Sequence, residues 1–170
     1  MLPWLPPYEV ELKVWGGKFA DLAFGAGVNL LVSERFRDAY LGTELTGLLP
    51  FTAVSIRKII PRRLSNSAPT YFFTSVVQGT AAIDDARSGL VREGKQICPK
   101  CRIGGIIKRT SRLILEENTW SGEDVFIARG LPGTIVVTDR FKEFYDFNNL
   151  TGGEFIPVED YSFDFYPGKD

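Results

Sequence analysis

Cys98 and Cys101 form a Cys-Pro-Lys-Cys motif, which is the strongest chemical signal in this 170-residue chain. The spacing lets both sulfurs reach one metal ion, and zinc takes thiolates readily. A structural zinc ion prefers four ligands, whereas the chain has only these two cysteines and no histidine. Three interpretations therefore stay open. The motif is a zinc site completed by carboxylates or by a second subunit, a knuckle that binds nothing, or a thiol redox pair.

The remaining composition limits the classes of reaction that the protein could catalyse. The absence of histidine excludes Ser-His-Asp and Cys-His nucleophilic arrangements. The neighbouring carboxylates Asp84 and Asp85 are better suited to a turn than to acid-base chemistry, because adjacent side chains point apart. We therefore predict that the protein is not an enzyme, and a histidine-free hydrolase is the weakest alternative.

Charge and hydropathy indicate where the protein acts. The net charge of −1 gives no bulk electrostatic case for nucleic acid or an anionic membrane as partner. Met1–Pro7 has neither the positive nor the continuous apolar part of a secretory signal, and no apolar run approaches the roughly 20 residues that span a bilayer. We expect a cytoplasmic protein that does not contact a membrane.

Basic residues surround the cysteines and suggest a second functional class. Only one acidic residue, Glu93, lies among them, and a basic metal knuckle is typical of nucleic-acid-binding or adaptor modules. The segment lacks the aromatic side chains that stack on bases, so this class stays an alternative. The basic residues are Arg92, Lys95, Lys100, Arg102, Lys108, Arg109 and Arg112.

An internal repeat organises the elements that must position these residues. Trp15–Gly47 aligns on Trp120–Gly152 without a gap at an offset of 105 residues, and eleven of the 33 positions are identical. The identities include Trp, Arg-Phe and Leu-Thr-Gly. Chance similarity between two strand-helix units is the weaker explanation of so specific a match.

Each copy of the repeat predicts a buried strand followed by a helix. Ser33 and Thr138 each follow a short apolar, β-branched run, and each can cap a helix by accepting a backbone N–H bond. Aromatic residues then recur at helical spacing on one face, which we expect to be buried. They include Phe36, Tyr40, Phe141 and Tyr145.

We therefore predict a single α+β domain over residues 1–170, built on two strand-helix repeat units with a mostly antiparallel sheet. The cysteine motif lies on an insertion at about residues 94–106. Strands outside the repeat are predicted at Tyr8–Val14, Phe51–Ile60, Tyr71–Val77, Arg112–Glu116 and Glu154–Tyr166. The oligomeric state stays open, a homo-oligomer included.

Several motifs follow one another in a characteristic order. They are the Ser/Thr-Asp/Glu-Arg-Phe helix start, Ala82-Ile83-Asp84, the Cys-Pro-x-Cys motif, Trp120–Phe126 and Phe155–Pro157. The chain in this respect resembles the double-CxxCG motif proteins, a paralogous family abundant in myxobacteria. Its members are regarded as immunity proteins that neutralise cognate toxins in competition between bacteria. The resemblance implies that this chain binds and neutralises a protein toxin, a nuclease among the candidates.

The chain differs from that family in the cysteine motifs that would bind a metal. The family pattern has two CxxCG knuckles, whereas this chain has one, and Arg102 stands where the family has glycine. A four-cysteine metal site is therefore not implied intact. The expected role in immunity is less affected, because inhibiting a toxin requires a surface and not an ion.

The C-terminal part of the chain predicts the toxin-binding surface. Glu143–Asp170 contains seven acidic residues and one basic residue, Lys169. A toxin that acts on nucleic acid presents a basic cleft, and an acidic surface attracts such a cleft. The alternative is that these acids only keep an edge strand soluble. The predicted toxin-binding residues are Glu154, Glu159, Asp160, Tyr161 and Asp164.

Overall fold

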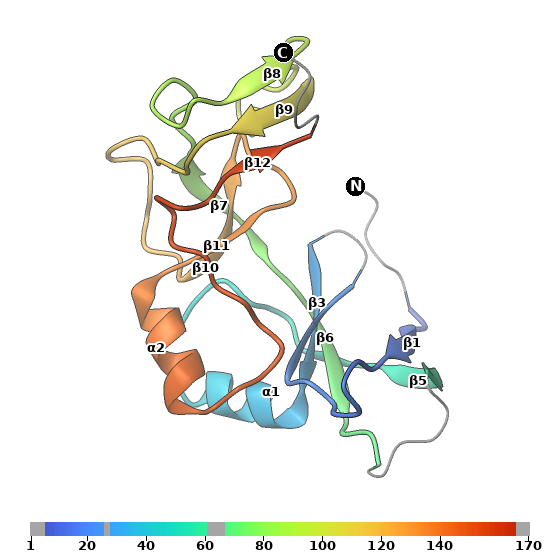
Figure 1. Ribbon diagram of the computed structural model, residues 1–170. Helices are drawn as coiled ribbons and strands as arrows, with labels where there is room; N and C mark the ends of the chain where they lie inside the picture. Colours follow the sequence, from blue (N-terminus) through green and yellow to red (C-terminus); the bar gives the residue numbers. More distant parts are fainter. Residues whose placement is uncertain (1–5, 26–27, 61–66, 166–170) are drawn as a thin grey trace.

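Helices α1 (Glu34–Leu41) and α2 (Asp139–Phe147) begin where the repeat predicts them. The Ser33 hydroxyl accepts a hydrogen bond from the Phe36 N–H at 3.2 Å, and the Thr138 hydroxyl accepts one from the Phe141 N–H at 3.4 Å. Both caps satisfy a backbone donor that the first helical turn leaves free. The computed structural model describes residues 6–25, 28–60 and 67–165, and its two helices lie side by side in Figure 1.

The described strands form four small sheets, and most neighbouring strands run antiparallel. Only the β1–β5 and β10–β7 pairs are parallel among them. The first sheet pairs β1 (Glu9–Lys13) with β5 (Ser55–Ile60), and the second has the order β2 (Leu22–Phe24), β3 (Asn29–Ser33), β6 (Tyr71–Ser75) and β4 (Thr52–Ala53). The third has the order β11 (Ile135–Val137), β10 (Val125–Arg129) and β7 (Val77–Ala82), and the fourth β12 (Phe163–Asp164), β9 (Ile106–Thr110) and β8 (Val91–Glu93).

Strands β6 and β7 follow each other almost directly and connect the two halves of the molecule. In Figure 1 they run from the β1–β5 pair, at one end, towards the β8–β9–β12 sheet at the other. The first half contains the unit β2-β3-α1, and the second half contains the unit β10-β11-α2. We call these the first and second repeat units, and each continues to its Leu-Thr-Gly sequence. The predicted single α+β domain with mostly antiparallel strands is confirmed.

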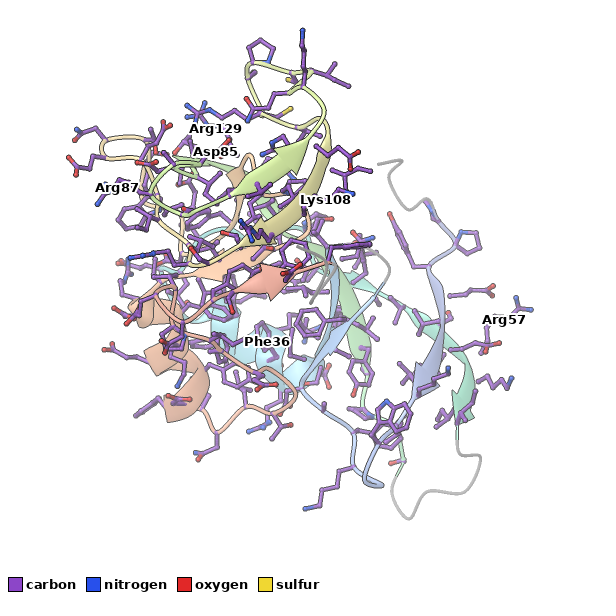
Figure 2. All side chains as sticks on the ribbon, turned by 45° about the horizontal axis from the view of Figure 1, so that its top comes forward. Phe36, Arg57, Asp85, Arg87, Lys108 and Arg129 are labelled. Atoms are coloured by element: carbon purple, nitrogen blue, oxygen red, sulfur yellow. The ribbon has the colours of Figure 1, made fainter. Side chains whose placement is uncertain are left out.

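Both repeat units bury side chains in one shared core. Phe36 of α1 contacts Phe144 of α2 edge to face at a centroid distance of 5.9 Å, and Tyr40 also contacts Phe144. The aromatic faces of the helices therefore meet each other, as Figure 2 illustrates for Phe36 inside the molecule. The predicted burial is confirmed, with exposures of 0% for Phe36, 4% for Tyr40, 2% for Phe141 and 4% for Tyr145.

Two predicted strands form only in part. Arg112–Glu116 contributes one isolated bridge, between Leu115 and Ile83, because the Leu113 N–H donates to the Val158 carbonyl and the Ile114 N–H donates to the Ser88 hydroxyl. In the C-terminal segment, as far as the structure describes it (to residue 165), only Phe163–Asp164 forms a strand, which pairs with β9. The Pro157 carbonyl accepts the N–H groups of Asp160 and Tyr161, so a turn interrupts the predicted alternation.

The repeat contains a length difference that the ungapped alignment hides. Val32 of β3 pairs with Leu22 of β2, whereas Val137 of β11 pairs with Val125 of β10. The offset between the units is thus 105 residues in the second strand and the helix, but 103 residues in the first strand. Between its paired residues, the β10–β11 hairpin is therefore two residues longer than the β2–β3 hairpin.

Candidate functional site

A buried carboxylate precedes the first strand of each repeat unit. Asp21 accepts hydrogen bonds from the Ser33 hydroxyl at 2.8 Å and from the Arg35 Nε at 3.1 Å, both in its own unit. It also accepts the N–H and the hydroxyl of Thr151, at 3.0 and 2.9 Å, from the second unit. Asp21 therefore ties the capping residue of one helix to the Leu-Thr-Gly sequence of the other unit.

Asp124 repeats this arrangement in the opposite direction. It accepts the Thr138 hydroxyl at 2.9 Å and lies 3.6 Å from the Arg140 guanidinium, both in the second unit. The N–H of Thr46, from the first unit, donates to Asp124 at 3.0 Å. The two units are therefore linked reciprocally, by one carboxylate from each.

These carboxylates are not suited to acid-base catalysis. Burial raises the pKa of the Asp21 carboxyl, but the hydrogen bonds from Arg35, Ser33 and Thr151 outweigh this effect and leave the pKa below its ordinary value. A carboxylate that already accepts several donors has little capacity left for a substrate proton. Asp84 has the turn role predicted for it, because its carboxylate accepts the Arg87 N–H at 2.9 Å.

The cysteine motif forms a tight knuckle between β8 and β9. The Cys101 N–H donates to the Cys98 sulfur at 3.3 Å, and the Arg102 N–H donates to the Cys98 carbonyl at 2.8 Å. Arg102 has a φ of 57°, the left-handed conformation that usually favours glycine. The Cys101 side chain, and then the backbone N–H groups of Cys101 and Lys100, lower the pKa of the Cys98 thiol. The knuckle thus holds the two sulfurs close together on one turn.

The surroundings of the knuckle do not complete a metal site within one chain. Arg102 forms a bidentate bond with Glu116 at 2.6 and 2.9 Å, and Glu93 bonds to Lys108 at 2.5 Å. Asp85 lies 4.0 Å from Arg92. The described part of the chain contains no group of three or more histidine, cysteine, aspartate or glutamate side chains that could hold an ion. Four zinc ligands therefore do not come together in one copy of the described chain.

Several basic side chains around the knuckle are engaged in hydrogen bonds or ion pairs within the protein. Arg92 donates to the carbonyls of Gly104 and Gly130, at 2.9 and 2.8 Å, and its side chain is only 9% exposed. Arg102 and Lys108 are held by the carboxylates just described. At least these three basic side chains stabilise the knuckle, which weakens the case for a surface that binds nucleic acid.

The predicted acidic residues lie on a strap, residues 153–161, and on β12 after it. Glu154, Glu159, Asp160 and Asp164 are exposed. Ile156 and Val158, between them, are 57% and 44% exposed. The strap therefore presents an apolar centre with a polar rim, which is the arrangement found in protein interfaces.

The strap is firmly attached to the second repeat unit. Phe155 packs edge to face on Tyr145 at a centroid distance of 5.0 Å, and the Leu113 N–H donates to the Val158 carbonyl at 2.8 Å. The Tyr161 hydroxyl is within hydrogen-bonding distance of the Thr134 hydroxyl, 2.9 Å away. Tyr161 is thus half-buried and helps to position the strap, whereas the neighbouring acids project outwards.

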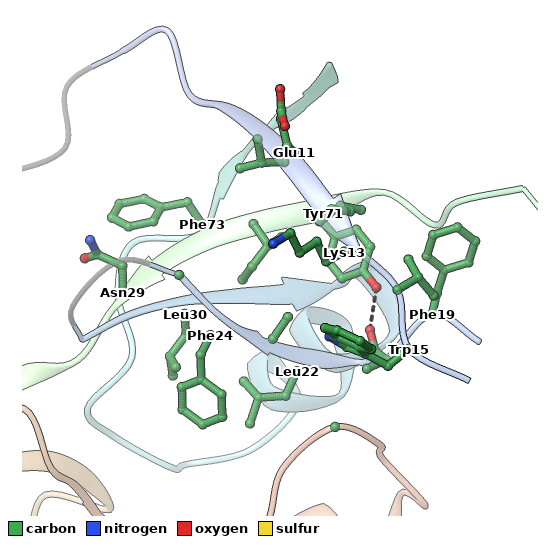
Figure 3. A pocket seen from close by; sticks show the side chains of 18 of the residues that line it. Glu11, Lys13, Trp15, Phe19, Leu22, Phe24, Asn29, Leu30, Tyr71 and Phe73 are labelled. Carbon is green, nitrogen blue, oxygen red and sulfur yellow. Dashed lines mark hydrogen bonds between the residues drawn. The ribbon is translucent and has the colours of Figure 1, made fainter. Parts of the chain in front are cut away.

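A groove of about 1220 Å³ lies between β1 and the β2–β3–β6 face, and Phe24 lines both this groove and a smaller pocket beside the strap. Leu30, Tyr71 and Phe73 belong to the apolar lining of the groove (Figure 3). The Tyr71 hydroxyl donates to the Ala20 carbonyl at 2.5 Å, and burial raises the pKa of Tyr71 to about 12. Trp15 and Phe24 line the groove while remaining 83% and 64% exposed. This groove is a second surface on which a protein partner could be tested.

Sequence reasoning missed Asp21 and Asp124, which link the two units. In the ungapped alignment Asp21 faces Phe126, and Asp124 faces Phe19. An alignment with a two-residue gap after the first strand would have placed the two aspartates together, each followed by an apolar strand.

Comparison with known proteins assigns the chain to a family. No helix in the described residues is long and apolar enough to cross a membrane. A search of the curated proteins finds none that matches the sequence. The model of the immunity protein family Imm11 matches residues 15–160, which include both repeat units, the knuckle and most of the strap. The chain therefore belongs to the Imm11 immunity protein family.

Proposed function

We propose that this immunity protein neutralises a cognate toxin by binding it through the strap and through Asp164, which follows the strap on β12. The observation that carries the proposal is the exposed apolar centre, Ile156 and Val158, surrounded by the carboxylates of Glu154, Glu159 and Asp160. Immunity proteins are generally not enzymes, so inhibition by occupying a surface is the mechanism that fits the geometry.

The structure of the strap explains how it would act. Phe155 and Tyr161 hold the backbone against the second repeat unit, so little conformational entropy is lost when the exposed residues meet a partner. Glu154, Glu159, Asp160 and Asp164 create a negative field that accelerates association with a basic partner. The proposed partner is therefore a toxin with a basic cleft, such as one that acts on nucleic acid.

Co-expression of the cognate toxin with variants of this chain tests the proposal. The triple reversal Glu159→Lys, Asp160→Lys and Asp164→Lys should reduce protection of the cells, because it replaces attraction by repulsion at the proposed contact. The matched control is the triple reversal Glu44→Lys, Glu117→Lys and Glu143→Lys, which changes the net charge equally at exposed positions elsewhere. The control should protect as well as the natural chain.

A further pair of substitutions tests the groove instead. Trp15→Ala and Lys18→Ala remove exposed side chains that line the groove and not the pocket beside the strap, and they leave the core closed. Full protection by this double variant, with lost protection by the strap variant, supports the proposal. The opposite pattern would place the toxin on the groove and overturn the assignment of the strap.

A further inference from the structure

The knuckle lies at an outer end of the molecule, where a second protein copy can reach it. It connects β8 to β9, which Figure 1 shows at the end of the molecule opposite β1 and β5. Ile97 is 84% exposed, and Ile103 and Ile106 are 43% and 57% exposed. One copy therefore leaves apolar side chains of the knuckle and of the start of β9 in water, although burying them would be favourable.

One chain presents half of a tetrahedral zinc site. Cys98 and Cys101 meet in a knuckle whose backbone N–H already bonds to one sulfur. The nearby carboxylates are not free to complete the site, because Glu116 and Glu93 bond to Arg102 and Lys108. Releasing either carboxylate would break one of these ion pairs. A second pair of thiols is therefore a better source of ligands than the chain's own acids.

The charges around the knuckle suit a four-thiolate site. Zinc with four thiolates carries a net charge of about −2, which a protein environment must compensate. Lys95 and Lys100 flank the cysteines, and both are exposed. Two copies would bring two such lysines each to the site. Without the negative charge of the zinc-thiolate site, these lysines would repel each other across a contact between identical surfaces.

We propose that two copies of the chain bind one zinc ion between their knuckles, with Cys98 and Cys101 of each copy as its ligands. The thiols release their protons when the metal binds, and no electron is transferred. Ile97, Ile103 and Ile106 of the two copies then pack around the site. This proposal concerns the assembly of the chain and is independent of the toxin.

Zinc titration of the full chain in reducing buffer, followed by light scattering after size-exclusion chromatography, tests the proposal. We expect one zinc ion per two chains, a dimer when zinc is present and a monomer after a strong chelator is added. Tight binding of one zinc ion per monomer would overturn the proposal, as would a dimer that persists without zinc. The absence of zinc binding by the reduced chain would also overturn it.

Two variants separate the metal from the packing. Cys98→Ser with Cys101→Ser should abolish both zinc binding and dimerisation, and an unchanged far-ultraviolet circular dichroism spectrum would show that the fold is intact. Ile97→Asp keeps the thiols but should weaken the dimer, whereas Phe147→Asp, at a side chain that is 86% exposed on α2, should not. A dimer that survives the double serine substitution would contradict the proposal.

Discussion

Asp21 and Asp124 accept the same kinds of hydrogen bond, each from its own repeat unit and from the other one. Asp21 binds Thr151 of the second unit, and Asp124 binds Thr46 of the first. The contact between Asp21 and Thr151 joins segments that lie 130 residues apart in the sequence. These reciprocal contacts make the two halves of the molecule dependent on each other for stability.

Replacing Asp21 should therefore destabilise the whole fold. Asp21→Ala leaves Ser33, Arg35 and Thr151 without their shared acceptor, and we expect a loss of about 2–4 kcal/mol in the free energy of unfolding. Urea unfolding measures the loss, with the exposed Asp38→Ala as the control. A double-mutant cycle with Thr151→Ala should show coupling of about 1 kcal/mol. Strictly additive effects would show that the contact between the units contributes nothing.

Stability should also depend on the protonation of Asp21. The pKa of its carboxyl is lower in the folded chain than in the unfolded one, so the unfolded chain binds more protons as the pH falls. The contribution is fully present above the unfolded pKa of about 3.9 and is lost as the pH falls through the folded pKa. Asp21→Asn should flatten the decrease in unfolding free energy below about pH 4. An unchanged slope would mean that Asp21 is not the titrating group.

The shared aromatic core gives a third prediction. Phe36→Ala or Phe141→Ala should each reduce the free energy of unfolding by about 3–5 kcal/mol, because each side chain is almost fully buried. Phe147→Ala is the matched control, since Phe147 lies in α2 but is 86% exposed. Chemical denaturation compares the three variants. A loss for Phe147→Ala as large as that for Phe36→Ala would contradict the described packing.

The Leu-Thr-Gly sequences require glycine for two reasons. Gly47 has a φ of 112°, and a Cβ there would lie 1.9 Å from the Val125 carbonyl oxygen. Gly47→Ala should lower the melting temperature more than Gly133→Ala, because Gly133 also has a positive φ, 90°, but a Cβ added to it would meet no atom within 4 Å. Equal effects would show that only the backbone conformation matters. The reciprocal contact of Gly152 with Leu22 should make Gly152→Ala behave like Gly47→Ala.

The helices could be predicted because their signals are local. Ser33 and Thr138 cap the helices that follow them, and the burial of Phe36 and Phe141 follows from helical spacing. The knuckle turn likewise lies within a few residues of the Cys-x-x-Cys motif. In each case the interacting groups are close in the sequence, so the pattern alone contains the information.

The linked aspartates could not be predicted in this way. Asp21 and Thr151 are 130 residues apart, and the two-residue difference between the hairpins hides the match between Asp21 and Asp124. The strand predicted at the C-terminal end is wrong in part for another reason. The sequence alternates as a strand does, but the Pro157 carbonyl accepts two backbone N–H groups and so forms a turn. Neither the distant partner nor the turn leaves a periodic signal in the sequence.

The rate at which the purified protein binds its toxin, measured at low and at high salt, tests the central proposal most directly. We expect the triple reversal of Glu159, Asp160 and Asp164 to slow association about tenfold or more at low salt, with a smaller difference at high salt, where charges are screened. The control reversal of Glu44, Glu117 and Glu143 should bind as the natural chain does. If the folded triple variant binds at an unchanged rate at every salt concentration, the strap is not the toxin-binding surface.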